Sequence, residues 1–255
     1  MSDTRRPFKI AAAQIPSIRG DVPANVSRHE AALRAAAAAG VSVVVFPELS
    51  LIGYEPEIAA SLAFTDDDIR LEPLRRIVLE HNLTTMIGAP IRTDDKPAIG
   101  TVILGPDGGR QIYRKMHLGG SEVSFFSPGT LPVVLEVESH RIGVSICADS
   151  SQCSHAESYY RLGARIYAAG VFLTDEWYLT DAPRLQKFAA DFGMLTVMAN
   201  QAASIGTHRS VGRSAVWNPS GSLLAEAEGT EEALVVATDV NGVWNAHTLG
   251  IQALT

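Results

Sequence analysis

Short apolar runs alternate along the chain with longer segments in which apolar residues recur at the spacing of a helix. The apolar runs are bounded by turn residues and are typical of buried strands; they cover residues 8–15, 41–48, 83–91, 164–173 and 195–201. Helices are predicted over residues 24–40, which Gly40 ends, over the later part of 66–82, after a turn at Pro73, and from about 154 to 163. A last helix is predicted over residues 181–194, with Pro183 in its first turn.

Hairpins fill much of the remaining pattern. Residues 98–117 contain two strand-like runs around the turn sequence Gly-Pro-Asp-Gly-Gly, residues 131–147 contain two around Glu138 and Ser139, and residues 213–240 contain three. Helices alternate with strands in the first and third quarters of the chain, and this mixture predicts an α/β layered domain with mixed sheets. No linker, repeat or low-complexity run divides the pattern, so we expect one domain over residues 1–255.

Composition and charge exclude several classes of protein. Hydrophobic residues make up 46% of the 255 residues, which is enough for a sizeable core, and the formal net charge of −7 with no basic stripe argues against nucleic-acid binding. No apolar run approaches the roughly 18 residues of a membrane-spanning helix. The N-terminal sequence lacks the apolar region of a signal peptide, and the two cysteines, Cys147 and Cys153, lack CxxC spacing. A reducing cytoplasm is therefore the expected location.

Three reactive side chains stand at predicted strand ends. Glu48 follows the buried run "VVVFP", Lys115 lies near the end of a hairpin strand, and Cys147 follows the strand-like "RIGVSI". Loops converge over a rigid base at strand ends, where binding and catalytic groups gather. An acid, an amine and a thiol in such positions are a plausible set for a thiol-dependent hydrolase.

Each of these residues also has an ordinary structural interpretation. A cysteine after an apolar strand, such as Cys147, is often a small buried hydrophobe. Cys153 has no motif around it and is interpreted as structural or incidental. Glu48 alone fits an acid at a helix start or on the surface, and Lys115, between Arg114 and His117, fits a solvated basic patch. The histidines show no metal-ligand spacing, so no metal or cofactor is expected.

Larger motifs surround the three residues and decide between these interpretations. The stretches "AAAQI", "FPELSLIGYEP", "YRKMHL" followed by "SEVSFFSPG", "GVSICAD" and "GRSAVWNPSGSLLAEA" occur in the order found in the nitrilase superfamily, the carbon–nitrogen hydrolases. The chain resembles the amidase-like branch of this family over almost its whole length. The resemblance implies a four-layer αββα sandwich of two mixed β-sheets flanked by helices, and a dimer of such sandwiches.

The resemblance also implies roles for individual residues. Glu48 matches the general base, Lys115 the catalytic lysine, Cys147 the nucleophile, and Glu122 a second acid in a loop after the lysine. The Ala148 backbone N–H would bind the oxyanion. The family usually has an aromatic residue at the position of Ala148, so the wall beside the thiol is expected to be more open or differently shaped.

Residues near these motifs add further expectations. Tyr54 and Trp177 are candidates for the pocket wall, with ordinary core aromatics as the alternative. Asp149 is expected to accept backbone hydrogen bonds and hold the turn after Cys147. By resemblance, an aspartate two residues after the nucleophile, in place of a glutamate, favours an amide substrate over a nitrile. The C-terminal "NAHTLGIQALT", with Leu249, Ile251 and Leu254, is a candidate for contact between two copies of the chain.

The expected reaction is hydrolysis of a small linear amide or carbamoyl compound through a cysteine thioester. A free thiol titrates near ~8.5, so a carboxylate must take its proton, while an ammonium and a backbone N–H stabilise the oxyanion. The alternatives are a nitrile hydrolase, an amide acyltransferase, and a catalytically idle member that serves as a binding or regulatory protein. The presence of Glu48, Lys115 and Cys147 together argues against the idle alternative.

Overall fold

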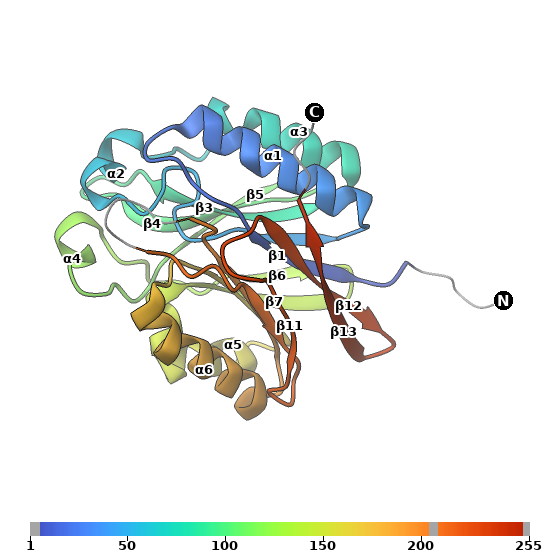
Figure 1. Cartoon of the computed structure of the whole chain (residues 1–255). Helices are drawn as coiled ribbons and strands as arrows, with labels where there is room; N and C mark the ends of the chain where they lie inside the picture. The colour runs from blue at the N-terminus through green and yellow to red at the C-terminus, as the bar shows by residue number, and fades with distance from the viewer. Residues whose placement is uncertain (1–5, 204–208, 252–255) are drawn as a thin grey trace.

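The computed structural model of the chain describes residues 6–203 and 209–251 and contains two β-sheets packed face to face (Figure 1). The first sheet has seven strands in the order β13-β12-β1-β2-β3-β4-β5. Its strands are β1 (Lys9–Gln14), β2 (Val43–Val45), β3 (Thr84–Ile91), β4 (Ala98–Leu104), β5 (Arg110–Arg114), β12 (Ala233–Val240) and β13 (Val243–Gly250). The central strands β1, β2 and β3 are parallel, and the outer pairs are antiparallel.

The second sheet has six strands in the order β11-β10-β9-β8-β7-β6. Its strands are β6 (Val134–Val137), β7 (His140–Ile146), β8 (Ile166–Val171), β9 (Leu195–Asn200), β10 (Ala215–Trp217) and β11 (Leu223–Glu226). Here β7, β8 and β9 are parallel, and antiparallel strands again flank them. Both sheets are therefore mixed, as predicted. Strands β3, β8 and β9 are buried along their whole length, which explains their continuous apolar sequences.

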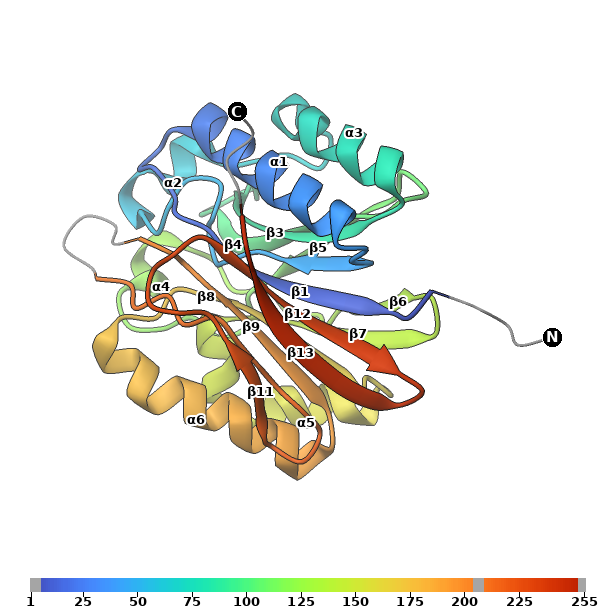
Figure 2. The same cartoon turned by 45° about the vertical axis from the view of Figure 1, so that its right-hand side comes forward.

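Helices cover the outer faces of the two sheets. Figures 1 and 2 show α1 (Val22–Ala38) and α3 (Glu72–His81) on the seven-stranded sheet, and α5 (Cys153–Arg161) and α6 (Asp175–Phe192) on the six-stranded sheet. These layers confirm the predicted αββα sandwich. Two short helices, α2 (Pro56–Leu62) and α4 (Glu122–Phe125), lie near one another at one end of the sheets, and two 3₁₀ turns, η1 (Ile69–Leu71) and η2 (Cys147–Ser151), complete the elements of the described residues.

Three details of the predicted pattern are wrong. Pro183 lies inside α6 and not in its first turn, because the helix starts at Asp175. Because proline has no backbone N–H, Pro183 leaves the carbonyl of Leu179 without its helical hydrogen bond. The cost is small because Leu179 is 75% exposed. Glu122 begins the short helix α4 and does not lie in a loop.

The third wrong detail is at the end of the chain, where β13 follows the last predicted strand. Leu249 and Ile251 pack against the core of this copy of the chain. The expected contact between two copies of the chain stays a prediction, and Leu254, which it also named, lies outside the described residues. Among those residues, no helix is long and apolar enough to cross a membrane.

Candidate active site

Glu48 reaches the interior because the chain after β2 passes between the two sheets. Two glycines make room for that segment: a Cβ at Gly88 on β3 would stand 2.1 Å from the Pro47 carbonyl oxygen, and a Cβ at Gly170 on β8 would stand 2.5 Å from that of Phe46. The Glu48 side chain is 1% exposed as a result. Its Oε2 atom has no hydrogen-bond partner among the described residues.

Cys147 stands at the end of β7, where the strand turns directly into η2. Its φ of 41° is in the left-handed region, which a residue with a side chain adopts only when its surroundings hold it there. The hydroxyls of Ser150 and Ser151 close the turn by donating to the carbonyls of Cys147 and Ala148, each at 2.7 Å. The Cys147 thiol points toward the Phe172 carbonyl oxygen at 4.0 Å.

Lys115 follows β5 and is fully buried, unlike the exposed Arg114 before it. Its Nζ atom donates to Glu48 Oε1 at 2.7 Å and to the two oxygens of Glu122 at 2.8 and 2.9 Å. The interpretation of Lys115 as part of a solvated basic patch is therefore wrong. One ammonium bridges two carboxylates that lie far apart in the sequence.

Glu122 is 3% exposed, and its carboxylate is fully occupied. In addition to Lys115, the Tyr54 hydroxyl donates to Oε1 at 2.8 Å and the Gly119 backbone N–H donates to Oε2 at 2.7 Å. A carboxylate accepts about four hydrogen bonds. Glu122 is thus arranged to hold the Lys115 ammonium and the Tyr54 hydroxyl in place.

Burial and charge set the protonation of this cluster. Burial raises the pKa of the Glu48 carboxyl from its ordinary 4.5 to about 7, although the charge of Lys115 acts in the opposite direction. Burial also raises the pKa of the Cys147 thiol, which the charge of Glu48 raises further and that of Lys115 lowers. For Lys115, burial acts to lower the pKa, but the negative charges of Glu48 and Glu122 raise it above its ordinary value. At neutral pH the site therefore holds a thiol, an ammonium and a carboxylate able to exchange a proton.

Asp149 ties the two strand ends of the site together. Its Oδ2 accepts from the Ile146 backbone N–H at 3.0 Å and from the Tyr113 hydroxyl at 2.6 Å, and its Oδ1 accepts from the backbone N–H groups of Met116 and His117 at 3.0 and 2.9 Å. It is fully buried and does not line the cavity. The turn after Cys147 and the residues after Lys115 are thus fixed to one carboxylate, which extends the role predicted for Asp149.

His117, Asp149 and His155 form the one group of the described residues whose ligand atoms are close enough for a metal ion, all within 4.8 Å. Most of the polar atoms of this group already contact protein groups, and His117 Nδ1 lies 3.1 Å from Asp149 Oδ1. The two ring nitrogens of His155 contact the hydroxyls of Tyr113 at 2.9 Å and Tyr167 at 2.8 Å, and Asp149 accepts the bonds described above. This arrangement is that of a buried polar network and not of a vacant ligand set.

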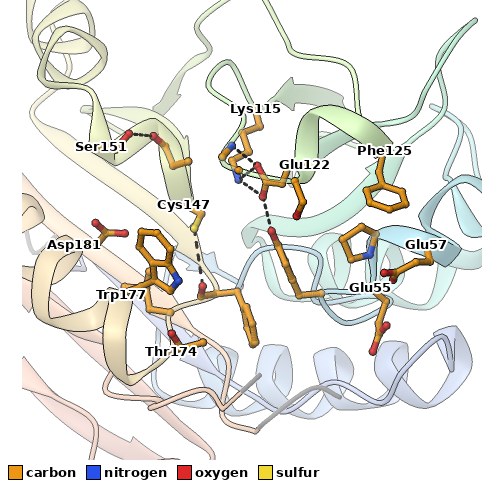
Figure 3. Close-up of a pocket in the computed structure, with 18 of the residues that line it drawn as sticks. Glu55, Glu57, Lys115, Glu122, Phe125, Cys147, Ser151, Thr174, Trp177 and Asp181 are labelled. Carbon is orange, nitrogen blue, oxygen red and sulfur yellow. Dashed lines mark hydrogen bonds and ion pairs between the residues drawn. The ribbon is translucent and has the colours of Figure 1, made fainter. Parts of the chain in front are cut away.

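A cavity of about 750 Å³ opens beside Cys147. Figure 3 shows Cys147 and Trp177 on one side of this cavity, with Lys115 and Glu122 across from them. Ala148, Tyr54 and Trp177 all line it, as expected, and the Trp177 side chain is 57% exposed. As the second residue of η2, Ala148 has a backbone N–H without an acceptor inside the turn. The volume lies well within the usual range of ligand pockets.

Sequence reasoning missed several cavity residues, most of them on α2, on α6 and after β8. Among them are Arg19, Glu55, Glu57, Phe125, Ser151, Phe172, Leu173, Thr174, Asp181 and Arg184. Phe172 stacks on Tyr54, with ring centroids 5.0 Å apart. Two ion pairs belong to this set, Arg19 with Glu55 and Arg184 with Asp181. The spacing of three residues between Asp181 and Arg184 on α6 is a local signal for the second pair. The sequence does not show that this pair faces the cavity.

Comparison with known proteins places this geometry in a family. The carbon–nitrogen hydrolase family model matches residues 9–244. An (R)-stereoselective amidase of Pseudomonas sp. is 28% identical over 92% of this chain and 86% of its own length. A nitrilase of Pyrococcus abyssi is 28% identical over 84% of this chain and 82% of its own length.

A solved structure shares the fold. A variant of the amidase from Nesterenkonia sp. AN1 superposes with a TM-score of 0.83 at 22% identity, over 91% of this chain and 93% of that one. That structure shows the result of Michael addition of acrylamide at its active-site cysteine. With the family model matching nearly the whole described chain, the protein belongs to the carbon–nitrogen hydrolase family of the nitrilase superfamily.

Proposed function

We propose that the protein is an amidase that hydrolyses a small linear amide or carbamoyl compound through a thioester on Cys147. The observation that carries the proposal is the buried Glu48–Lys115–Glu122 cluster beside a strained Cys147 at the wall of a cavity. The likeness to an (R)-stereoselective amidase supports an amide substrate, and the likeness to a nitrilase keeps a nitrile as the alternative.

The first half of the reaction forms the thioester. Glu48 takes the proton of the Cys147 thiol while the sulfur attacks the amide carbon, and the carbonyl electron pair moves to oxygen. The Lys115 ammonium and the Ala148 N–H stabilise this oxyanion. Glu48 then gives its proton to the nitrogen, the C–N bond breaks, and ammonia or an amine leaves.

The second half returns the enzyme to its starting state. Glu48 takes a proton from water, and the oxygen attacks the thioester carbon. The C–S bond breaks, the acid is released, and Glu48 returns its proton to the Cys147 sulfur. The raised pKa of Glu48 suits both directions of transfer, because a group that titrates near neutral pH both takes and gives a proton readily. The mechanism needs Cys147 as a free thiol, which supports the proposed location in a reducing cytoplasm.

A panel of amides and matching nitriles tests the proposal. We expect short aliphatic and dicarboxylic monoamides to release ammonia, and added hydroxylamine to convert the thioester to a hydroxamate. Nitrile turnover well above amide turnover would assign a nitrile hydrolase. Transfer to hydroxylamine far faster than hydrolysis would favour an acyltransferase. No turnover of any panel member would favour a binding or regulatory protein.

A further inference from the structure

The cavity contains an arginine whose position on α6 gives it access to a bound molecule. Arg184 Nη1 donates to Asp181 Oδ1 at 2.5 Å, and the side chain of Asp181 is 9% exposed while that of Arg184 is 45% exposed. A buried carboxylate thus holds an accessible guanidinium at the cavity wall. A guanidinium has five N–H donors, and Asp181 occupies only one side of this fork.

The other cations of the cavity are less suited to bind an anion. Lys115 is completely buried and donates to two carboxylates. Arg19 is paired with Glu55 at 2.9 Å, and the charge of Glu57 acts on it as well. Two acids therefore offset the charge of Arg19, whereas Arg184 is paired with one.

The α6 wall adjoins the nucleophile. The segment from Phe172 to Thr174 leads from the Cys147 thiol into α6, because the Phe172 carbonyl faces the thiol and Thr174 precedes the first residue of the helix. Figure 3 shows Trp177 and Asp181 on the Cys147 side of the cavity, while Glu55 and Glu57 lie on the opposite side, beyond Glu122. Cys147, Trp177 and Arg184 all line this cavity, and Arg184 is paired with Asp181, so the side of the cavity that holds the thiol also holds the guanidinium.

We propose that Arg184 binds a carboxylate at the far end of the acyl chain, while Trp177 contacts the methylene groups between them. The substrate is then the monoamide of a short dicarboxylic acid. The inference rests on the proposed function, because it takes Cys147 as the acyl-carrying residue. Arginine pairs with carboxylates through two parallel N–H···O bonds, and the contact with Asp181 fixes the guanidinium before the substrate arrives. A cationic chain end would meet the exposed guanidinium before it reached the buried Asp181.

Chain-matched substrates test the inference. Succinamate and glutaramate carry a carboxylate where butyramide and valeramide carry a methyl group, and 5-aminovaleramide carries an ammonium. We expect the wild-type enzyme to prefer the anionic amides, and Arg184→Gln to lower their kcat/KM by about 10- to 100-fold, mainly through KM. The same variant should leave butyramide and valeramide almost unchanged. Arg161→Gln, which removes an exposed ion-paired arginine on α5, is the control and should change none of the values.

Several outcomes would overturn the inference. For the wild-type enzyme, they are equal rates for anionic and neutral amides, or a preference for 5-aminovaleramide. For the variants, they are an equal loss for all amides in Arg184→Gln, or a loss of the anionic preference in Arg19→Gln and not in Arg184→Gln. Calorimetric binding to Cys147→Ala separates this result from the proposed function, since it needs no turnover. If Cys147→Ala binds glutaramate and the added Arg184→Gln removes this binding, the subsite is supported even if no amide is hydrolysed. If Cys147→Ala does not bind glutaramate, the subsite is rejected.

Discussion

At the scale of single residues, the balance of charge around Lys115 determines where the proton resides. One ammonium faces Glu48 and Glu122, so the cluster is one unit negative when both acids are ionised. A thiolate beside this cluster would add a second negative charge in a buried place, and the pKa of Cys147 is raised accordingly. Cys147 therefore rests as a thiol, and in the proposed reaction Glu48 accepts its proton during the attack.

The rate should report the protonation of Glu48. Because the pKa of this carboxyl is raised to about 7, the base is protonated and inactive below that pH and available above it. We expect kcat/KM to fall as pH decreases through about 7. Glu48→Gln should lower the rate by about 10²- to 10⁴-fold and remove this dependence. A wild-type rate that stays constant down to pH 5 would contradict the assignment of Glu48.

Removal of Lys115 should destabilise the fold as well as the reaction. Lys115→Met leaves two buried carboxylates without their cation, and breaking a buried pair in this way typically costs about 3–5 kcal/mol of unfolding free energy. Adding Glu122→Gln to Lys115→Met should recover part of the loss, because it removes one uncompensated charge. Urea unfolding measures both changes.

Lys187→Met is the control for this experiment. Lys187 is also paired with an acid, Asp191, but its side chain is 70% exposed. We expect its removal to leave the free energy of unfolding almost unchanged. The account of the buried cluster is wrong if Lys115→Met is no more destabilising than Lys187→Met.

At the scale of elements, the sequence predicts a strand best where the whole segment is buried. Strands β1, β3, β8 and β9 follow from continuous apolar runs, and the β4–β5 and β6–β7 hairpins follow from turn residues between two such runs. Strand β13 was missed because none of its eight residues is fully buried: five are exposed and three are half-buried, so the segment has no apolar run. Its backbone bonds to β12 define it, and that pairing is not visible in the local sequence.

The candidate site was predictable to a similar extent. Glu48, Lys115, Cys147 and Glu122 carry motifs, and the structure brings Glu48 and Glu122 together on Lys115. The residues of α6 carry no such motif, and Pro183 moved the predicted start of that helix past Trp177, so Asp181 and Arg184 were not seen as one wall of a cavity. Contacts between segments that lie far apart in the sequence depend on packing, and they can be identified only in the folded chain.

Gly88 should be necessary for the position of Glu48. In Gly88→Ala, the new Cβ would stand 2.1 Å from the Pro47 carbonyl oxygen and 2.6 Å from the Leu49 nitrogen, so the backbone that carries Glu48 must move. We expect a loss of about 1–3 kcal/mol in stability together with most of the activity. Gly250→Ala at the end of β13 is the matched control, since a Cβ there meets nothing within 4 Å. Equal effects of the two substitutions would contradict this explanation.

At the scale of the whole molecule, the sandwich joins groups that the chain separates widely. Glu48 follows a strand of one sheet, Cys147 follows a strand of the other, and Lys115 follows the edge strand β5. Asp149 then links the residues after β5 to the turn after β7. The position of the reactive groups therefore depends on how the two sheets pack, and a change far from the cavity can reach them.

The outer helices support the proposal that the protein is a homodimer. Large apolar side chains are exposed on α5, just after it and on α6, among them Tyr160 at 43%, Leu162 at 46% and Leu179 at 75%. Exposed apolar surface of this kind often marks a protein contact. Light scattering at micromolar concentration should give about twice the chain mass of 27.2 kDa. Leu162→Glu with Leu179→Glu should lower it toward one chain, whereas a wild-type monomer would contradict the proposal.

The central claim is that the acyl group of an amide is carried by Cys147. The direct test is acid quenching of the enzyme during turnover of an amide that it cleaves, followed by peptide mass spectrometry. We predict the added acyl mass on the peptide with Cys147, no adduct in Cys147→Ala, and an unchanged adduct in Cys153→Ser, since Cys153 is exposed and outside the cavity lining. Steady amide hydrolysis by Cys147→Ala at near wild-type rates, or an acyl group carried only by Cys153, would contradict the account.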